Sequence, residues 1–548
     1  MIYGVTSKVY GESRDSDTNE NVSSEVDQDE DEEECEKEFL VIDDGSQPVR
    51  KRRKSNASTV GGDLPMRQLS GAEIGQKNIG LFAGAMLLIN NITGPGVPEL
   101  ANLFAEAGWF LPVLCMTFIW IMATLSASMY CEAMRHIPGN EHFCGRIEYT
   151  SIVRFYFGDR SYIFAQIGLN GALQSFNVIS VVQCVRIMDN LISAAFGMSC
   201  ALNLTPFSYE WTDPTGTNVP VVGSSSIISC QNTNHIEGGH AWGCHIVVSL
   251  GFVSMLVLVA PCAKWNLEES MIVQKVSFFL TSACWIVWAA VSMFVSTAPE
   301  LDARVIAPVN TNEMTGAQSS VLGIILFNFG FVTTVPSWVN EKHPAVSINA
   351  SLWGSTMTCL FVFLLVGVPG AYAYQDLLKG PASNTCVKQT FDAAYNCHTN
   401  LMTLLADAES VPVSLEGYGK ARILGKTSAY IFPLVSVAST IPVISIIVKY
   451  NMLENGFSRR FSLFWGALFP WLVSLPLLYM PNVLAEIINL TSLVFVTVTN
   501  FVVPLMIYRK LQFIEMDPYP SRQLSSDKIH PPAGVHVHHA LPPSWNLS

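Results

Sequence analysis

Ten long stretches without Asp, Glu, Lys or Arg run along this chain of 548 residues. A helix that crosses a bilayer needs about 20 mainly apolar residues, because each residue adds about 1.5 Å across a hydrocarbon core of about 30 Å. Only 14% of the residues are charged, against about 25% in soluble domains. The sequence therefore predicts an all-α integral membrane protein with about ten spans, in the windows 78–98, 107–131, 162–185, 241–263, 276–299, 314–340, 343–375, 427–448, 461–485 and 487–508.

Basic residues in the connecting loops predict the orientation, because loops rich in Lys and Arg stay on the cytoplasmic side. With the N-terminus inside, the inner loops contain Arg135, Arg146, Arg154 and Lys264, whereas the large outer loop 198–240 contains no Lys or Arg. Both termini are therefore expected in the cytoplasm of a multi-pass protein. This pattern does not distinguish a plasma membrane from a vacuolar or lysosomal one.

Three segments follow from the charge distribution. Residues 1–76 are expected to form a disordered acidic tail that carries much of the net charge of −13, with a regulatory role as the alternative. Residues 77–511 form the predicted transmembrane domain, and 512–548 a second cytoplasmic tail. Because the acidic balance belongs mainly to a tail, the sequence predicts no nucleic-acid partner.

Cysteines in the predicted outer loops indicate disulfides, because that face is oxidising. One loop holds Cys200 and Cys230 and the other holds Cys386 and Cys397, so we expect the pairs 200–230 and 386–397, with unpaired thiols as the alternative. Asn203 begins an Asn-Leu-Thr glycosylation sequon, near the predicted membrane edge.

Two spans are interrupted by residues that cannot continue a helix. The first contains Gly94, Pro95 and Gly96, flanked by asparagines and Thr93, and the sixth contains Asn328, Gly330 and Pro336. In hydrocarbon, unpaired backbone groups are tolerated only where they line a cavity or are buried in protein. Spans one and six each begin a five-span half, and interrupted segments at matching positions indicate a transporter site.

Broken helices suit a zwitterion, because freed amides attract a carboxylate and freed carbonyls attract a cation or an ammonium group. A polar face of span three, which includes Asn177, looks into the bundle for substrate or for interhelical packing. The predicted substrate-binding residues are Thr93, Gly94, Pro95, Gly96, Asn177, Asn328, Phe329, Gly330 and Phe331.

Two further groups concern coupling. In span eight, Ser439 and Thr440 offer hydroxyls for an oxygen-lined cation site, although such hydroxyls also bond to their own helix. Glu99 is a carboxylate well inside a span, where such groups are functional candidates. It is a candidate for carrying a proton, the alternative being that it reaches a watery vestibule and stays ionised.

The run Gly-Pro-Gly-Val at 94–97, followed by Gly-Trp at 108–109, resembles the first-span signature of the amino acid/auxin permease family, part of the amino acid–polyamine–cation superfamily. Asn-Glu at 340–341 and Pro-Leu at 504–505 are similar to that family's sixth and last spans. The chain departs from the pattern at Ala101, where the family usually has proline. Its ten predicted spans are one fewer than in many relatives, which a truncated sequence or a true ten-span form would each explain.

The resemblance implies a 5+5 inverted-repeat bundle of the leucine-transporter type that carries amino acids by alternating access with H⁺ or Na⁺. It also implies that Asn90 joins Thr440, with Ser439 beside it, in a Na⁺ site. The leading hypothesis is thus a secondary active, monomeric symporter with an amino-acid substrate, surrounding lipid and no cofactor beyond the ion. An amino-acid sensor using the same site is the alternative, and an enzyme is not expected, since the spans offer no cluster of His, Asp or Glu.

Overall fold

The computed structural model describes residues 77–138, 140, 143, 145–204, 228–231, 247–296, 317–374, 378, 400–406, 418–478, 487–488 and 490–516. These residues belong to one compact unit. Within them, eight helices are long and apolar enough to cross a membrane, and two shorter apolar helices, Leu81–Ile92 and Leu250–Lys264, fill the places of the predicted first and fourth spans. The helical membrane fold is confirmed, and the ten predicted windows each have a helical counterpart.

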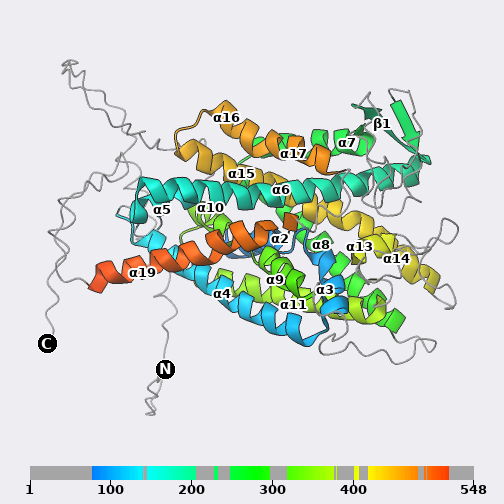
Figure 1. The fold of residues 1–548 in the computed structure, drawn as a ribbon, viewed down its shortest axis with the longest axis horizontal. Coiled ribbons are helices and arrows are strands. Elements are labelled where there is room, and N and C mark those ends of the chain that lie inside the picture. The colour runs from blue at the N-terminus through cyan, green and yellow to red at the C-terminus, as the bar shows by residue number, and fades with distance from the viewer. Residues whose placement is uncertain are drawn as a thin grey trace, which may run out of the picture. The chain divides into compact units, whose positions relative to one another are not determined.

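The first five spans contain one broken helix and four continuous or nearly continuous ones. Figure 1 shows how they are arranged. Their elements are α2 Leu81–Ile92, η1 Val97–Glu99, α3 Leu100–Ala107, α4 Phe110–Arg135, α5 Tyr149–Phe157, α6 Asp159–Phe196, α7 Leu250–Val259, η4 Ala260–Lys264 and α8 Leu267–Ser296.

The second five spans begin again with a broken helix, as the prediction of two matching halves requires. Their elements are α9 Ala317–Asn328, η5 Val332–Thr334, α10 Val335–Glu341, α11 Ile348–Tyr374, α13 Leu401–Ala406, α14 Tyr418–Phe432, η6 Pro433–Val437, α15 Ala438–Glu454, α16 Arg459–Leu463, η7 Phe464–Leu468, α17 Phe469–Leu477, η8 Ser492–Val496, η9 Val498–Val502 and α19 Val503–Met516.

A small antiparallel sheet lies at one end of the long helix α6 (Figure 1). Its strand order is β2-β1-β3, with bounds β1 Ser199–Asn203, β2 Ile228–Gln231 and β3 Val247–Ser249. Cys200 and Cys230 are register partners in this sheet and form a disulfide, which confirms that predicted pair. The other predicted pair, Cys386 and Cys397, lies outside the described residues. Asn203 pairs with Val247 at the edge of β1.

Helix ends differ from the charge-free windows in two places that matter. The predicted fourth span begins later, because β3 occupies 247–249 and α7 starts only at Leu250. The fifth begins earlier: α8 starts at Leu267, nine residues before the predicted window at 276. Lys275 set the start of that window, but its side chain is exposed on α8 and does not interrupt the helix. The segment before Lys275 is therefore part of the bundle.

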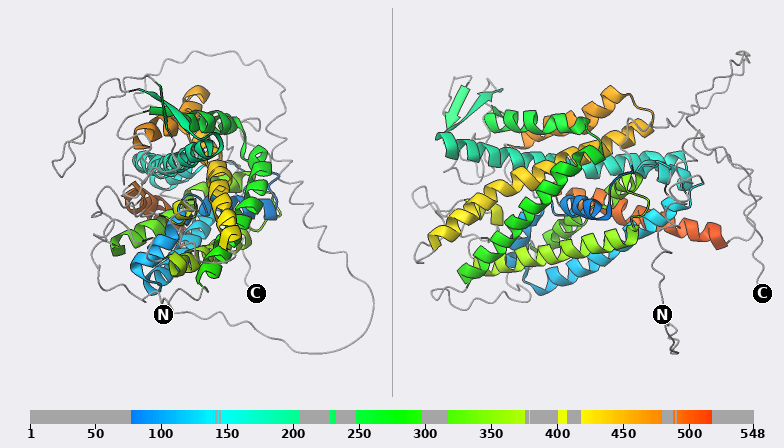
Figure 2. Two further views of the ribbon diagram at one scale, coloured as in Figure 1. Left: turned by 90° about the vertical axis from the view of Figure 1, so that its right-hand side faces the viewer. Right: turned by 180° about the vertical axis from the view of Figure 1, so that it is seen from behind.

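The helices are arranged with polar side chains inward, as expected where lipid surrounds the protein. Phe118 of α4, Phe164 of α6 and Ile272 of α8 are exposed. The opposite face of α8 buries a row of polar side chains at helical spacing, which comprises Ser270, Gln274, Ser277 and Thr281. Figure 2 shows α8 crossing the bundle beside α14, which it contacts.

Candidate functional site

The first span loses its helical bonding at the predicted place. The Thr93 amide still donates to the Ile89 oxygen four residues earlier, at 2.8 Å. The next backbone bonds span only three residues, as in a 3₁₀ turn: the Val97 amide donates to the Gly94 oxygen and the Glu99 amide to the Gly96 oxygen. Within the described backbone, the Gly94 and Gly96 amides donate to no main-chain oxygen. Pro95 and Pro98 have no N–H at all. The break therefore leaves two buried amides without a main-chain acceptor beside the start of η1.

The sixth span breaks in the same manner. The helix α9 ends at Asn328. The Gly330 amide then donates to the Phe327 oxygen only three residues earlier, at 3.2 Å, as in a 3₁₀ turn. The Thr333 amide is bound by a side chain, Asn500 Oδ1, at 3.3 Å. Both interruptions that were predicted from glycine and proline are therefore present.

The two breaks touch each other. A Cβ added to Gly96 would lie 2.4 Å from Asn328 Oδ1, so the amide of Asn328 lies directly against the Gly96 backbone. Asn328 is held in this position because its Nδ2 donates to the Ile324 oxygen at 2.9 Å. The sequence positions 96 and 328, each predicted on its own half, thus form one site.

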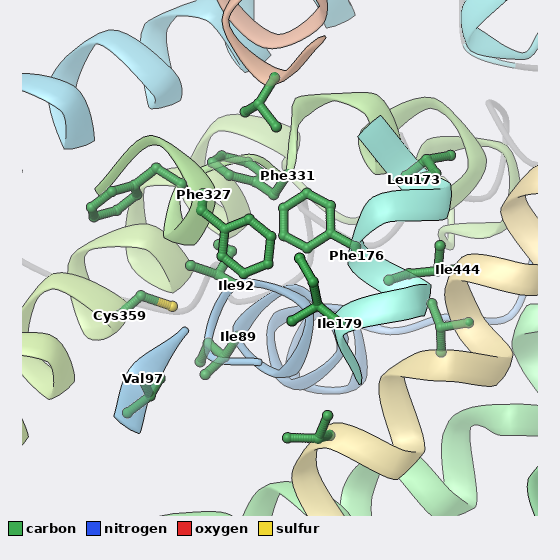
Figure 3. Close-up of a cluster of buried hydrophobic side chains, with 14 of the residues drawn as sticks. Ile89, Ile92, Val97, Leu173, Phe176, Ile179, Phe327, Phe331, Cys359 and Ile444 are labelled. Carbon is green, nitrogen blue, oxygen red and sulfur yellow. The ribbon is translucent and has the colours of Figure 1, made fainter. Parts of the chain in front are cut away.

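Apolar rings close the space around this contact. Phe327 stacks on Phe176 of α6 with ring centroids 4.2 Å apart, and Figure 3 shows both rings together with Phe331, Ile92 and Ile179. A Cβ at Gly330 would lie 2.9 Å from Phe176 Cζ. The site is therefore small, buried and largely apolar apart from its backbone groups and Asn328.

Two polar side chains bind the carbonyl oxygens of the first break. Gln183 Nε2 donates to the Pro95 oxygen at 3.0 Å, and Ser436 Oγ donates to the Thr93 oxygen at 3.4 Å. Ser436 lies in the π-helical turn η6, a type of irregularity that is frequent at functional sites. Gln183 and Asn500 were not predicted. Gln183 lies six residues after Asn177, which is about 240° around a helix with about 3.6 residues per turn, so the polar face of span three did not indicate it.

The remaining predicted substrate residues are less central. Thr93 Oγ1 donates to the Ile89 oxygen of its own helix at 2.7 Å. Phe329 packs edge to face on Phe363 of α11, with centroids 5.3 Å apart. The Phe331 oxygen accepts from the Thr334 amide at 2.9 Å. Asn177 Nδ2 donates to Ser445 Oγ of α15 at 3.3 Å.

The predicted cation ligands are close together, but a fourth residue connects them. Gln274 of α8 accepts from Asn90 Nδ2 and donates to the Ser439 carbonyl oxygen, both at 2.9 Å. Ser439 Oγ is 2.9 Å from Ser277 Oγ, and Thr440 Oγ1 donates to the Val437 oxygen at 2.8 Å. Gln274 was missed because Lys275 placed it outside the predicted span, although the buried polar row on α8 was a usable signal.

Glu99, the proton-coupling candidate, lies at the end of η1 and its Oε1 accepts from Asn400 Nδ2 at 3.0 Å. Asn400 also accepts the Thr403 amide with Oδ1, at the start of α13. The carboxylate is thus tied to a segment that connects spans seven and eight.

A second buried carboxyl, which the sequence did not indicate, lies at the end of the bundle predicted to face the cytoplasm. Glu148, 1% exposed, precedes α5 and accepts hydrogen bonds from Ser337 Oγ at 2.6 Å and Asn340 Nδ2 at 3.0 Å, both on α10. Asn451 Nδ2 of α15 donates at 3.3 Å, and the Glu148 amide donates to Glu454 Oε2 at 3.0 Å.

Burial raises the pKa of the Glu148 carboxyl from its ordinary value of 4.5 to about 7. The hydrogen bonds from Ser337 and Asn340 oppose the rise in pKa, and the nearby Glu341 adds to it. Glu148 therefore exchanges its proton near neutral pH while it joins α5 to α10 and α15.

Residues 77–210 match the family model described as "Transmembrane amino acid transporter protein". The resemblance predicted from the first-span residues is thereby confirmed over this part of the chain. No curated protein matches the sequence. A solved structure that is similar is that of a nucleobase-cation-symport-1 family transporter, in a closed conformation with bromovinylhydantoin bound, at 14% identity, with 78% of this chain and 76% of that chain covered and a TM-score of 0.44.

Proposed function

We propose that the protein is a secondary active transporter that moves amino acids across a membrane by alternating access, coupled to H⁺ or Na⁺. The observation that carries the proposal is the contact between Gly96 and Asn328 at two helix breaks buried among the spans. The backbone amides without acceptors and the Asn328 side-chain amide lie together, so they can bind a charged or polar group of a ligand. A purely apolar site would not bind such a group.

The chemistry of the site supports a zwitterion as the substrate. The Gly94 and Gly96 amides, beside the N-terminal end of η1, suit a carboxylate, because helix N-termini carry partial positive charge. Asn328 Oδ1 accepts hydrogen bonds and suits an ammonium group. The rings of Phe176 and Phe327 border the same point, which favours a substrate with a neutral, apolar side chain.

The other end of the sixth span supports alternating access. Short α10 follows the break directly, and its Ser337 and Asn340 bind Glu148. Opening that end requires those bonds to break, because α10 cannot tilt away from α5 while they hold. A substrate that moves the backbone of the sixth-span break therefore also moves α10. That movement changes the hydrogen bonds between α10 and Glu148 that close the other end.

The test is uptake of a panel of radiolabelled amino acids into liposomes that contain the purified full chain, with imposed pH or Na⁺ gradients. We expect saturable, gradient-driven uptake of a subset with apolar side chains. Absence of uptake for the whole panel under both gradients, with correctly folded protein, would contradict the proposal.

A further inference from the structure

Gln274 occupies the place between the two spans where the resemblance puts a cation. Its Nε2 donates to the Ser439 carbonyl oxygen, and its Oε1 accepts from Asn90 Nδ2, each at 2.9 Å. Asn90 Nδ2 also donates to the backbone oxygen of Gln274 at 2.9 Å. This second bond fixes the direction of both amides, because a reversed Asn90 would place its oxygen against two acceptors. Gln274 is 1% exposed and joins α2 to α15 in the bundle interior.

The donor set does not fit Na⁺ in this arrangement, because a hard cation takes oxygen ligands. Asn90 turns its nitrogen, not its oxygen, toward Gln274, and the Ser439 oxygen faces an N–H. Thr440 Oγ1 is bound within its own helix. Among the described residues, Asn90 Oδ1 is buried with no hydrogen-bond partner, which marks the place where an oxygen ligand remains. A cation would have to displace the Gln274 amide to reach the Ser439 oxygen.

We propose that Gln274 determines ion selectivity and makes transport independent of Na⁺, its neutral amide forming the connection between α2 and α15 that a bound cation would otherwise form. The inference rests on the proposed transport function. An amide N–H carries partial positive charge and satisfies a buried carbonyl without bringing a net charge into the membrane. Because the amide is covalently attached, it is not released during a cycle, so a Na⁺ gradient does no work through this site. H⁺ is then the coupling ion.

The uptake experiment compares wild type, Gln274→Ala, Gln274→Glu and Gln174→Ala in liposomes, with Na⁺ replaced by choline at constant pH gradient. Gln174 is the matched control, because it is a buried glutamine of α6 whose Nε2 donates to a backbone oxygen, that of Trp465, at 2.8 Å. We expect wild type and Gln174→Ala to change less than about twofold on removal of Na⁺. A Gln274 variant is expected to acquire Na⁺ stimulation of about fivefold or more, a coupling of ordinary size.

A second readout does not need transport. Thermal unfolding of the purified wild type is compared in NaCl and choline chloride, and we expect no Na⁺-specific change in Tm. Gln274→Glu, which keeps the shape of the side chain but faces the Ser439 oxygen with a second acceptor, is expected to gain a Na⁺-specific rise of about 2 °C. If Gln274→Ala does not fold, this isosteric variant and the wild type decide the question.

Three results would overturn the inference: wild-type uptake that falls fivefold or more in choline, a Na⁺-specific rise in the wild-type Tm, or folded Gln274 variants that are indifferent to Na⁺ in both assays. Failure of the proposed function is distinguishable, since it gives no uptake of any amino acid, while the Tm comparison still reports on Gln274.

Discussion

Asn328 and Gly96, 232 positions apart in the sequence, lie so close that a Cβ on the glycine would be 2.4 Å from the asparagine Oδ1. Two helix breaks therefore meet through a backbone and one amide. This closeness limits what either position tolerates.

Gly96→Ala is expected to reduce uptake about tenfold or more, because the added methyl group meets Asn328 and overpacking of this kind costs about 1–3 kcal/mol. The double variant Gly96→Ala/Asn328→Ala removes the clash and should unfold at a higher temperature than the single variant. Gly354→Ala is the control, since that Cβ would have nothing within 4 Å. Equal uptake by Gly96→Ala and Gly354→Ala would contradict the importance of the contact.

Stability is expected to fall as pH rises between about 4.5 and 7, through Glu148. Its pKa is raised by burial from 4.5 to about 7, so in this window the folded chain keeps a proton that the unfolded chain has lost. Below pH 4.5 both states hold the proton, and above about 7 both have lost it. The loss of stability across the window is at most about 3.5 kcal/mol, at about 1.4 kcal/mol for each pH unit between 4.5 and about 7.

Glu148→Gln, which imitates the protonated form, should reduce this dependence in thermal unfolding at pH 5 and pH 7.5. Glu132→Gln changes a half-buried carboxylate at the end of α4 and should keep the wild-type dependence. If all three proteins lose the same Tm between these pH values, Glu148 is not the responsible group.

Glu99→Gln should abolish accumulation driven by a pH gradient if this carboxylate carries the coupled proton. A gradient of one pH unit supplies about 1.4 kcal/mol, enough for about tenfold accumulation per proton. Glu106→Gln is the matched control and should keep the wild-type accumulation. Glu106 lies on the neighbouring helix α3 and also accepts a hydrogen bond from an asparagine, Asn102 Nδ2, at 3.1 Å. Accumulation by Glu99→Gln equal to that of wild type would remove the role.

Reduction of the Cys200–Cys230 bond should lower Tm, because the bond closes a segment with a sequence separation of 30. For a loop of this size, the chain-entropy estimate is about 3–4 kcal/mol. Cys230→Ser should unfold at a lower temperature than the oxidised wild type and respond less to reductant, because only the predicted Cys386–Cys397 bond would remain to be reduced. Cys262→Ser, which changes a free, half-buried thiol, serves as control. A reductant effect of equal size in Cys230→Ser would show that another bond is responsible.

The spans and their two interruptions could be predicted because lipid imposes simple rules: long apolar windows, and glycine with proline where bonding must end. The matching positions of the breaks predicted that the two would lie together, but the contact of Gly96 with Asn328 is seen only in the fold. Gln274 could not be found by the same rule, since the predicted window opens only after the exposed Lys275, which directly follows Gln274. Glu148 was beyond reach for another reason: its partners Ser337 and Asn451 are 189 and 303 positions away, and only the folded chain brings them together.

The shortness of α10 has a mechanical consequence. Its seven residues, Val335–Glu341, extend from the edge of the sixth-span break to the bonds with Glu148. At about 1.5 Å for each residue the segment is about 10 Å long, too short to bend along its length. Any rotation of α10 at the break therefore also displaces its end beside Glu148. Under the proposed function, occupancy of the substrate site and protonation of Glu148 would both act on this one rigid segment.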